Sequence, residues 1–432
     1  MYDWANSVYN LVISSAIFPI FYDAATKNTY ALKNGFDVDN VDSNSVTVDF
    51  WGLQVSPSVL YSVVLSVSFL IVAFLSPILS GVADYTGSKK KYLKFFCYLG
   101  SISCVSLYWF DANYMELSMI PIFVASICFW NSLVFYNSFL PEIAHPKDHD
   151  RISAKGFSMG YYGSMILLVV CLAIIMGIGS EYTSISFILV GIWWSSFSQI
   201  TYRVLPDNVF DKRPKTDYIK KGFRELKLVY KEFIKTHRLK RYLQAFFFFN
   251  TGVQTVMLMA TIFASKAIVW PGDSGTTGLI ISILLIQILA AFGAFFMAKL
   301  SSNIGNIKTL IISVVLWLFI CAAAFIVTTP SEFYVLAACV GLVMGGVQAI
   351  ARSTYSKFLP DTSDHASYFS FFDVSEKIGI VFGTAFFALA EFLFDNIRFS
   401  VISVAIFFII GLLLLFRVPK KEINIENKVF SI

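Results

Sequence analysis

The sequence predicts an all-α membrane protein with twelve transmembrane helices, and two observations carry that prediction. The 432 residues are 57% hydrophobic and only 14% charged, with a mean hydropathy of +0.69, whereas soluble domains are closer to half apolar and a quarter charged. The apolar residues also form continuous runs of about twenty, the length of helix that crosses a hydrocarbon core of about 30 Å. A β-barrel fits less well, because its strands would alternate polar and apolar residues.

Polar breaks separate twelve apolar runs, and we expect a helix in each because an open sheet would leave backbone groups unpaired in lipid. The predicted spans are 4–24, 57–82, 92–110, 118–140, 156–178, 184–204, 241–263, 276–298, 309–328, 332–351, 366–390 and 398–417. The first run has no basic segment before it and no small-residue cleavage site, so we expect a retained span and not a signal peptide.

The longest polar stretch, 205–240, divides the chain into two six-helix halves. We expect an N-terminal half at 1–204, a linker at 205–240, a C-terminal half at 241–417 and a tail at 418–432. Apolar residues recur at helical spacing among the lysines of the linker, which predicts a basic amphipathic helix on the cytoplasmic leaflet. These apolar residues are Ile219, Phe223, Leu226, Tyr230 and Phe233. We expect no nucleic-acid partner for this basic run.

The other long loop, 25–56, carries Asp37, Asp39, Asp42 and Asp49, and we expect it outside the cell without a fold of its own. The orientation follows from the basic residues. Of the 33 Lys and Arg, 28 fall in segments on one side of the predicted membrane, four fall on the opposite side and Lys377 lies within a span. Loops rich in Lys and Arg stay in the cytoplasm. We therefore expect both termini to be cytoplasmic, in a bacterial cytoplasmic (inner) membrane.

The residue types that carry enzyme chemistry are not grouped in this sequence. All six cysteines fall inside apolar runs, where we expect small core residues. The four histidines lie in polar loops between the runs. The cysteines are Cys97, Cys104, Cys128, Cys171, Cys321 and Cys339, and the histidines are His145, His149, His237 and His365. We therefore expect no metal site, no cofactor and no enzymatic activity.

The loop between spans two and three has a distinctive sequence, SGVADYTGSKK at residues 80–90. A glycine followed by Asp84, Gly87 and a basic pair resembles the loop motif of the major facilitator superfamily. Ser80 replaces the usual first glycine. The matching loop of the second half, 298–308, keeps Gly305 but has Ser302 where the Asp would be. A carboxylate at such a position can face a helix N-terminus or an Arg, and we expect Asp84 to stabilise one conformation without touching solute.

Shorter motifs extend the resemblance along the chain: YDWANS at 2–7, LPEIA at 140–144, RISAKGF at 151–157, GGVQ at 345–348, RS at 352–353 and FLP at 358–360. Together they resemble the autophagy-related vacuolar effluxer branch of that superfamily, from Tyr2 to about Gly383. The resemblance implies the twelve-helix major facilitator fold and solute transport, with amino-acid efflux in fungal members. It places motif residues with expected conformational or gating roles at Asp3, Asp84, Gly87, Glu142, Arg151 and Arg352.

Span eleven contains three charged residues, Asp373, Glu376 and Lys377. A charge at the centre of a spanning helix costs about 2.5–3.5 kcal/mol on insertion scales. Lys377 lies about eleven residues from Ala366, roughly 16 Å into the membrane, and Asp373 is spaced to pair with it. Two interpretations remain open, a self-neutralised structural pair and a site for solute or protons. We expect Glu376 to point about 100° away from Lys377, for proton coupling or packing against span two.

Uncharged polar residues also follow particular spans. Asn6, Asn10 and Ser14 form a stripe on span one, Asn250 and Gln254 on span seven, and Asn131 and Gln348 lie in spans four and ten. In the superfamily these four spans line the central cavity. Ordinary interhelical hydrogen bonds, worth about 0.6 kcal/mol each, are the alternative for any one residue. As a set, the expected cavity residues are Asn10, Ser14, Asn131, Asn250, Gln254, Gln348, Asp373 and Lys377.

The leading hypothesis is a monomeric secondary carrier in membrane lipid for a small polar or zwitterionic solute, working by rocking of its two halves, with proton coupling as an option. A non-transporting membrane sensor or scaffold on a carrier fold is the alternative, although such a protein would be expected to carry an added soluble domain. The linker at 205–240 is too short for one. The identity of the solute, the direction of transport and the coupling ion do not follow from the sequence.

Overall fold

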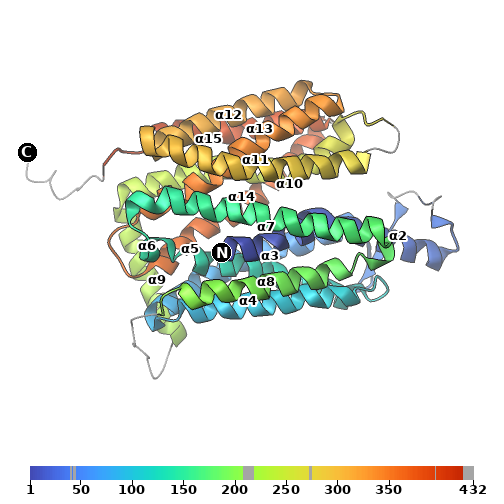
Figure 1. Cartoon of the computed structure of the whole chain (residues 1–432), viewed down its shortest axis with the longest axis horizontal. Coiled ribbons are helices and arrows are strands. Elements are labelled where there is room, and N and C mark those ends of the chain that lie inside the picture. The colour runs from blue at the N-terminus through green and yellow to red at the C-terminus, as the bar shows by residue number, and fades with distance from the viewer. Residues whose placement is uncertain (39–40, 42–44, 208–217, 272–274, 395, 422–432) are drawn as a thin grey trace, which may run out of the picture. The chain divides into compact units, whose positions relative to one another are not determined.

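The computed structural model of the chain describes residues 1–38, 41, 45–207, 218–271, 275–394 and 396–421. It is almost entirely helical (Figure 1). The elements in chain order are α1 (Tyr2–Val8), the π-helical η1 (Tyr9–Ala16), α2 (Ile17–Asn34), β1 (Val48–Phe50), β2 (Leu53–Val55), α3 (Pro57–Thr86), α4 (Lys89–Ser106), η4 (Leu107–Trp109), α5 (Met115–Asn137), α6 (Leu140–Ile143), η5 (Pro146–Asp148), α7 (His149–Gly177), η6 (Ser180–Tyr182), α8 (Ile185–Val204), α9 (Tyr218–Lys235), α10 (His237–Ala267), α11 (Gly275–Ile304), α12 (Asn306–Ile326), α13 (Pro330–Phe358), α14 (His365–Phe394) and α15 (Ile397–Phe416).

The predicted spans correspond to long helices in the same order. Ten helical segments of the described chain are long and apolar enough to cross a membrane. The remaining two predicted spans are occupied by α4, which begins with three lysines, and by α8, whose second half is rich in Ser, Gln and Thr. The fold is therefore the twelve-helix arrangement predicted from the sequence.

Several helices are longer than the apolar runs that predicted them. The run at 156–178 corresponds to α7, which already begins at His149, and the run at 332–351 corresponds to α13, which continues to Phe358. A helix keeps its backbone hydrogen bonds after it leaves the hydrocarbon core. These helices therefore continue beyond the core through extra turns, whose residues are polar. These extensions hold many of the polar contacts described below.

The expectation that loop 25–56 lacks a fold of its own is wrong. The first helix continues to Asn34 and ends at Gly35, whose φ of 70° is the left-handed conformation common after a helix. Further along, β1 and β2 pair as an antiparallel hairpin. Its turn residues Trp51 and Gly52 have φ values of 51° and 80°, as a two-residue hairpin requires. Asp39 and Asp42 lie outside the described residues.

The described chain forms two compact units. Unit 1 contains Met1–Val72, Lys90–Leu133 and Met159–Pro206, and unit 2 contains Ala73–Lys89, Val134–Ser158 and the described part of Asp207–Ile432. The end of α3, the end of α5, α6 and the start of α7 therefore pack with the last six spans. The units do not coincide with the sequence halves 1–204 and 241–417.

Small residues bring helices close together within each unit. In unit 1, Gly160 and Gly163 of α7 lie against Ser7 and Trp4 of the first helix. In unit 2, a Cβ atom on Gly341 of α13 would come within 2.6 Å of the Ile286 carbonyl oxygen of α11. Helices associate in membranes largely through such close approaches.

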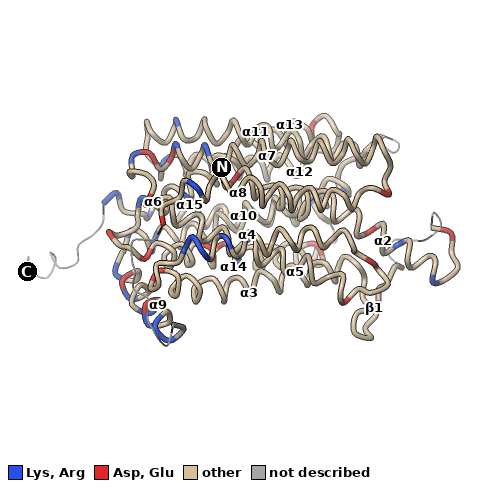
Figure 2. The backbone as a smooth tube through the Cα atoms, turned by 60° about the horizontal axis from the view of Figure 1, so that its bottom comes forward, with Lys and Arg blue, Asp and Glu red and all other residues tan. Residues whose placement is uncertain are grey.

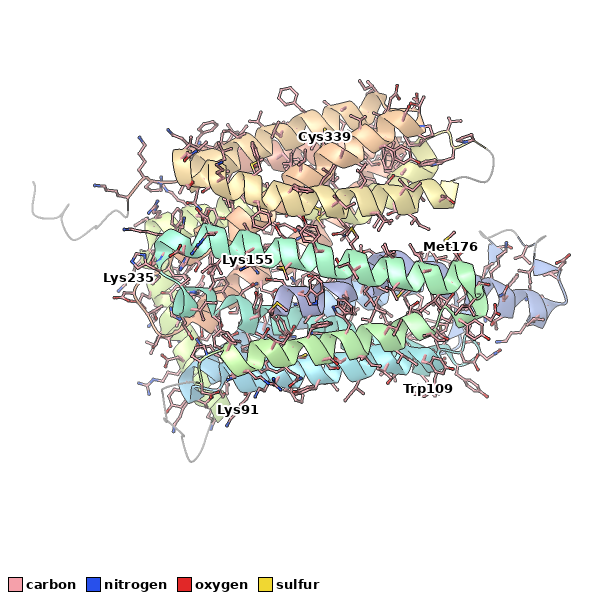
Figure 3. All side chains as sticks on the ribbon, in the orientation of Figure 1. Lys91, Trp109, Lys155, Met176, Lys235 and Cys339 are labelled. Atoms are coloured by element: carbon pink, nitrogen blue, oxygen red, sulfur yellow. The ribbon has the colours of Figure 1, made fainter. Side chains whose placement is uncertain are left out.

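Charged residues gather at one end of unit 2, which we call the basic end and define by Lys155, Lys235, Lys299, Lys357 and Arg417. Figure 2 shows Lys and Arg concentrated along α9 and the neighbouring chain ends. Lys155 and Lys235 are labelled at this end in Figure 3. Figure 3 also labels Cys339, which is exposed, while the other five cysteines are buried. The prediction that all six are core residues is thus wrong for Cys339, whose side of α13 faces away from its neighbours.

Candidate functional site

Three charged residues of α14, Asp373, Glu376 and Lys377, form a buried cluster with groups from two other helices of unit 2. The Lys377 Nζ atom lies 3.0 Å from Asp373 Oδ1 and 3.2 Å from Glu376 Oε1. Gln254 of α10 donates to Glu376 Oε1 over 3.3 Å, and the Ser76 hydroxyl of α3 donates to Asp373 Oδ2 over 3.4 Å. Lys377 is 1% exposed. This cluster, which we call the α14 cluster, lies about 18 Å along a helix of about 45 Å, near mid-span.

The expectation that Glu376 points away from Lys377 is wrong. Adjacent Cα–Cβ bonds do diverge by about 100° on a helix, but the long stems of Lys and Glu bend toward each other and bring their charged ends into contact. The cluster therefore combines two carboxylates with one ammonium. When all three groups are ionised, its formal charge is −1.

The other two predicted cavity residues of unit 2 are Asn250 on α10 and Gln348 on α13. Asn250 is buried one turn before Gln254, and its Nδ2 atom has no hydrogen-bond partner in the described chain. Gln348 of α13 is half-buried, with its Nε2 atom 3.5 Å from the Met257 sulfur. Gln254 links α10 to α14 through its hydrogen bond to Glu376.

The remaining predicted cavity residues, Asn10, Ser14 and Asn131, belong to unit 1. Asn10 and Ser14 are half-buried within π-helical η1, a type of distortion that is frequent at functional sites. Asn131 is fully buried on α5 and donates to the Ile127 carbonyl over 2.9 Å. Its Oδ1 atom has no partner in the described chain.

Buried polar atoms without partners are costly, about 1–3 kcal/mol each. Asn131 Oδ1 in unit 1 and Asn250 Nδ2 in unit 2 are two such atoms, on residues that the sequence assigns to a polar cavity. Water or a polar solute is the usual source of the missing partner. Both residues are therefore suited to a hydrated surface.

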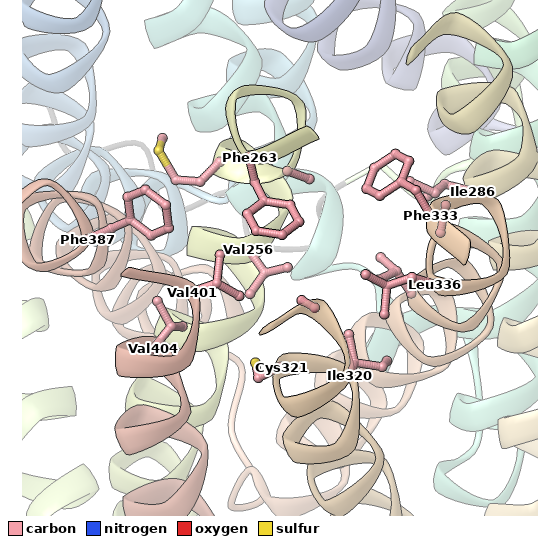
Figure 4. Close-up of a pocket in the computed structure, with 15 residues that line it drawn as sticks. Val256, Phe263, Ile286, Ile320, Cys321, Phe333, Leu336, Phe387, Val401 and Val404 are labelled. Carbon is pink, nitrogen blue, oxygen red and sulfur yellow. The ribbon is translucent and has the colours of Figure 1, made fainter. Parts of the chain in front are cut away.

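A separate cavity of about 40 Å³ lies among α10 to α15 in unit 2. Figure 4 shows Val256, Phe263, Phe333 and Phe387 pointing into it from three helices, α10, α13 and α14. Its 15 lining residues are all apolar or sulfur-containing. An unpaired charge in such a site would be strongly disfavoured. We therefore do not assign the solute to this cavity.

Asp84 caps the first turn of α14 at the basic end. Its Oδ1 atom accepts from the Ala366 N–H over 3.2 Å and its Oδ2 atom from the Ser367 N–H over 2.7 Å. A carboxylate is favoured there because helix N-termini carry unpaired N–H groups and partial positive charge. Gly87, with a φ of 63°, ends α3 in the left-handed conformation and turns the chain toward α4.

Glu142 of α6 lies beside this contact and joins two helix starts. Its Oε1 atom forms an ion pair with Lys89 at the start of α4 and lies 3.0 Å from His365 Nδ1 at the start of α14. A carboxylate only accepts, so Nδ1 donates in this contact. Burial lowers the pKa of the Lys89 ammonium, while the carboxylates of Asp84 and Asp364 act in the opposite direction.

Asp150, in the first turn of α7, is a gating candidate that the sequence did not reveal. Its Oδ2 atom lies 2.7 Å from Lys357 Nζ and accepts from the Ser301 hydroxyl over 2.9 Å, and its Oδ1 atom accepts from Asn306 over 2.7 Å. These partners come from the ends of α13 and α11 and from the start of α12. Asp150 is 6% exposed, so its charge is compensated almost entirely by these groups.

Arg352, at the end of α13, contacts the end of α5 and the start of α7. It donates to the Ser153 hydroxyl and carbonyl over 3.0 Å each and to Asn137 Oδ1 over 3.1 Å. Its guanidinium group also lies 4.2 Å from the ring centroid of Phe157. A planar guanidinium suits this combination of forked donation and stacking.

The structure therefore brings Asp84, Glu142 and Arg352 into contacts between the last six spans and the preceding segments 73–89 and 134–158. It does not do so for two other predicted gating residues. Arg151 is an exposed side chain paired with Asp148 at 3.0 Å, and Asp3 is buried in unit 1 in the first turn of α1. We call the contacts of Asp84, Glu142, Asp150 and Arg352 the basic-end contacts.

We expect Asp84→Asn to loosen the basic end without affecting solute binding. The neutral amide loses the charge–dipole attraction to α14, which is worth up to about 2 kcal/mol when partly buried. This corresponds to a shift of up to about thirtyfold in the conformational equilibrium. The rate at which a charged maleimide labels Ser80→Cys, a buried position one turn from Asp84, should rise accordingly in a Cys339→Ser background. Asp148→Asn, which neutralises an exposed acid, is the control. An unchanged labelling rate would contradict the assignment.

Solved structures share this arrangement of helices. The human organic anion transporter MFSD10 (TETRAN) matches with a TM-score of 0.68 at 10% identity over 96% of this chain and 98% of its own. The transporter FucP in its outward conformation matches with a TM-score of 0.64 at 14% identity over 96% of this chain and 99% of its own. The fold is that of the major facilitator superfamily.

Sequence relatives define the branch. The chain is 28% identical over 431 residues to "Uncharacterized MFS-type transporter YxiO" of Bacillus subtilis (strain 168), covering 98% of this chain and 94% of the relative. It is 23% identical over 476 residues to "Autophagy-related protein 22-1" of Penicillium rubens, covering 88% and 78%. Residues 1–427 match the family described as "Vacuole effluxer Atg22 like". The chain belongs to this family and is an integral membrane transporter of small solutes.

Proposed function

We propose that this transporter exports a small zwitterionic solute of the amino-acid class and that the α14 cluster binds it. The observation that carries the proposal is the buried combination of one ammonium with two carboxylates on α14. An amino acid presents the complementary groups, a carboxylate for Lys377 and an ammonium for Asp373 or Glu376. Hydrogen bonds between charged groups are also the strong ones. Export is suggested by the family description of a vacuole effluxer.

The surplus carboxylate offers a route to proton coupling. Two carboxylates and one ammonium leave one negative charge, which is costly in a buried site. A proton neutralises it, whereas a zwitterion, whose net charge is zero, does not. A proton on one of the two carboxylates and the ammonium of the solute would compete for the same oxygen atoms, and such competition is the property that an exchanger of solute for protons needs.

The basic-end contacts supply the conformational part of the mechanism. Each of them joins the last six spans to a segment of the first six, through Asp84, Glu142, Asp150 or Arg352. In alternating access the access path opens on one side while it closes on the other. We propose that these contacts close the cytoplasmic path and break when the carrier opens inward.

This mechanism requires the basic end to be cytoplasmic, with both termini on that side and the division at 205–240 between two repeats. A fluorescent protein fused after Ile432, which lies outside the described residues, is expected to fluoresce in the cytoplasm, since loops rich in Lys and Arg are retained there. A phosphatase inserted at the exposed hairpin turn Trp51–Gly52 should be active outside the cytoplasm. Activity of a periplasmic reporter at Ile432 would exclude the orientation.

Solute class is tested by binding to purified protein. Thermal stabilisation by ligand follows the ratio of free ligand to Kd, so a panel of amino acids can be ranked without a transport assay. For any amino acid that stabilises the protein, its amide and its N-acetyl derivative each remove one charged group. We expect each to bind at least about tenfold more weakly, because a hydrogen bond to a charged group is worth roughly 1.5–3 kcal/mol. Equal binding of all three forms would exclude zwitterion recognition.

A further inference from the structure

Helix α9 has one face that is fixed to the protein. Gly222 faces α3, where a Cβ atom would come within 2.5 Å of Val82 Cγ2 and 2.9 Å of its backbone nitrogen. Seven and eleven residues further on, Val229 and Phe233 are 2% and 8% exposed. The ring of Phe233 lies 5.4 Å from that of Phe371 on α14. Thus α9 packs against both α3 and α14.

Two other faces of α9 are largely exposed, although the Tyr230 ring also lies 6.0 Å from that of Phe371 on α14. At about 100° per residue, Phe223, Tyr230 and Ile234 form a stripe beside the packed face, and they are 47%, 51% and 40% exposed. The next stripe is basic, and its five side chains fall within an arc of about 80°. They are Lys220, Arg224, Lys227, Lys231 and Lys235, all exposed. The helix thus presents an apolar stripe and a basic stripe side by side.

The orientation of α9 determines what these stripes meet. The helix runs across the ends of the long helices of unit 2 and not along them (Figure 1). Because the long helices of an integral protein lie along the membrane normal, α9 lies near the membrane plane, at the boundary of the lipid. An interfacial helix places its apolar side among acyl chains and its basic side among headgroups.

We propose that α9 is a binding surface for anionic lipid headgroups. Its basic stripe would hold the phosphates of lipids such as phosphatidylglycerol, while Phe223, Tyr230 and Ile234 contact the acyl chains. Charge complementarity favours this occupant: five cations within about 80° of arc lie next to aromatic and aliphatic side chains.

The test uses the full chain in lipid nanodiscs. An environment-sensitive fluorophore is attached at Phe223→Cys in a Cys339→Ser background, in which the other five cysteines are buried. Brominated phosphatidylglycerol or brominated phosphatidylcholine is added at equal mole fraction to phosphatidylcholine discs. We expect at least twofold stronger quenching by the anionic lipid. A second label at Ile234→Cys repeats the measurement in case the first variant is poorly folded.

A charge-matched pair of variants identifies the basic stripe as the cause. Changing the first four stripe residues to Gln (K220Q, R224Q, K227Q, K231Q) should remove the preference for phosphatidylglycerol. Changing four exposed lysines elsewhere (K91Q, K155Q, K420Q, K421Q) gives the same change in net charge and should keep it. Inorganic phosphate in solution should not replace the lipid effect.

Equal quenching by the two lipids, or none by either, would show that another occupant covers this face and would overturn the proposal. Loss of the preference in both charge variants would do the same, because it would indicate a general effect of net charge.

Discussion

We expect the Asp373→Asn/Lys377→Met variant to lose transport by about a hundredfold or more and to remain folded. The double change removes both partners of a buried ion pair, which is often close to neutral for stability. It also removes two charged groups that would bind the solute, each worth roughly 1.5–3 kcal/mol. The readouts are solute flux into proteoliposomes and the midpoint of thermal unfolding.

The double variant separates function from packing where a single change does not. Lys377→Met alone leaves Asp373 and Glu376 close together without their shared cation, and an uncompensated buried charge destabilises by itself. A matched control exists in the same unit, the ion pair of Lys266 with Glu391 at 2.7 Å. Lys266→Met/Glu391→Gln should leave transport intact. Normal transport by the Asp373/Lys377 variant would reduce the α14 cluster to a structural role.

We expect Asp150→Asn to open the basic end more strongly than Asp84→Asn does. Removing one partner of a buried pair costs about 3–5 kcal/mol. The lower end of this range applies, because the Lys357 side chain is 20% exposed and keeps its contact with Asn306 at 3.0 Å. A cost of about 3 kcal/mol corresponds to a change in equilibrium of roughly a hundredfold. Labelling of Ser80→Cys by a charged maleimide should accelerate accordingly.

The charge-swapped variant Asp150→Lys/Lys357→Asp tests whether the pair itself is responsible. It restores opposite charges at the same two positions, so labelling should return part of the way toward the wild-type rate. If labelling of the swapped variant were accelerated by as much as the two single changes together, each residue would act through other neighbours. Asp148→Asn again controls for loss of an exposed acid, which should have little effect.

The membrane fold could be predicted from the sequence because one physical feature, an apolar run long enough to span a bilayer, recurs along the chain. Twelve apolar runs of spanning length leave little choice of structure in lipid, and each run has a helix at its place. The hydropathy pattern failed only outside the hydrocarbon. Nothing in loop 25–56 distinguished the β1–β2 hairpin, because a three-residue strand gives almost no periodicity to detect.

Some of the residues that form buried polar contacts were recognisable in the sequence, and those that were not recognisable share one physical reason. Asp373, Lys377 and Gln254 stood out because polar groups are rare within spans. Asp150 and Lys357 lie in helical turns beyond the apolar runs, where charged residues are ordinary, so their composition gave no signal. The pairing of Glu376 with Lys377 depends on side-chain bending, which spacing does not encode.

The central claim, that the α14 cluster binds a zwitterion during alternating access, is tested most directly by counterflow. Proteoliposomes loaded with an unlabelled amino acid that stabilises the purified protein are diluted into the labelled form. We predict transient accumulation of label by the wild type and by Lys266→Met/Glu391→Gln, and none by Asp373→Asn/Lys377→Met. Binding without counterflow in the wild type would favour a sensor over a carrier. Equal counterflow in all three proteins would contradict the assignment of the solute site.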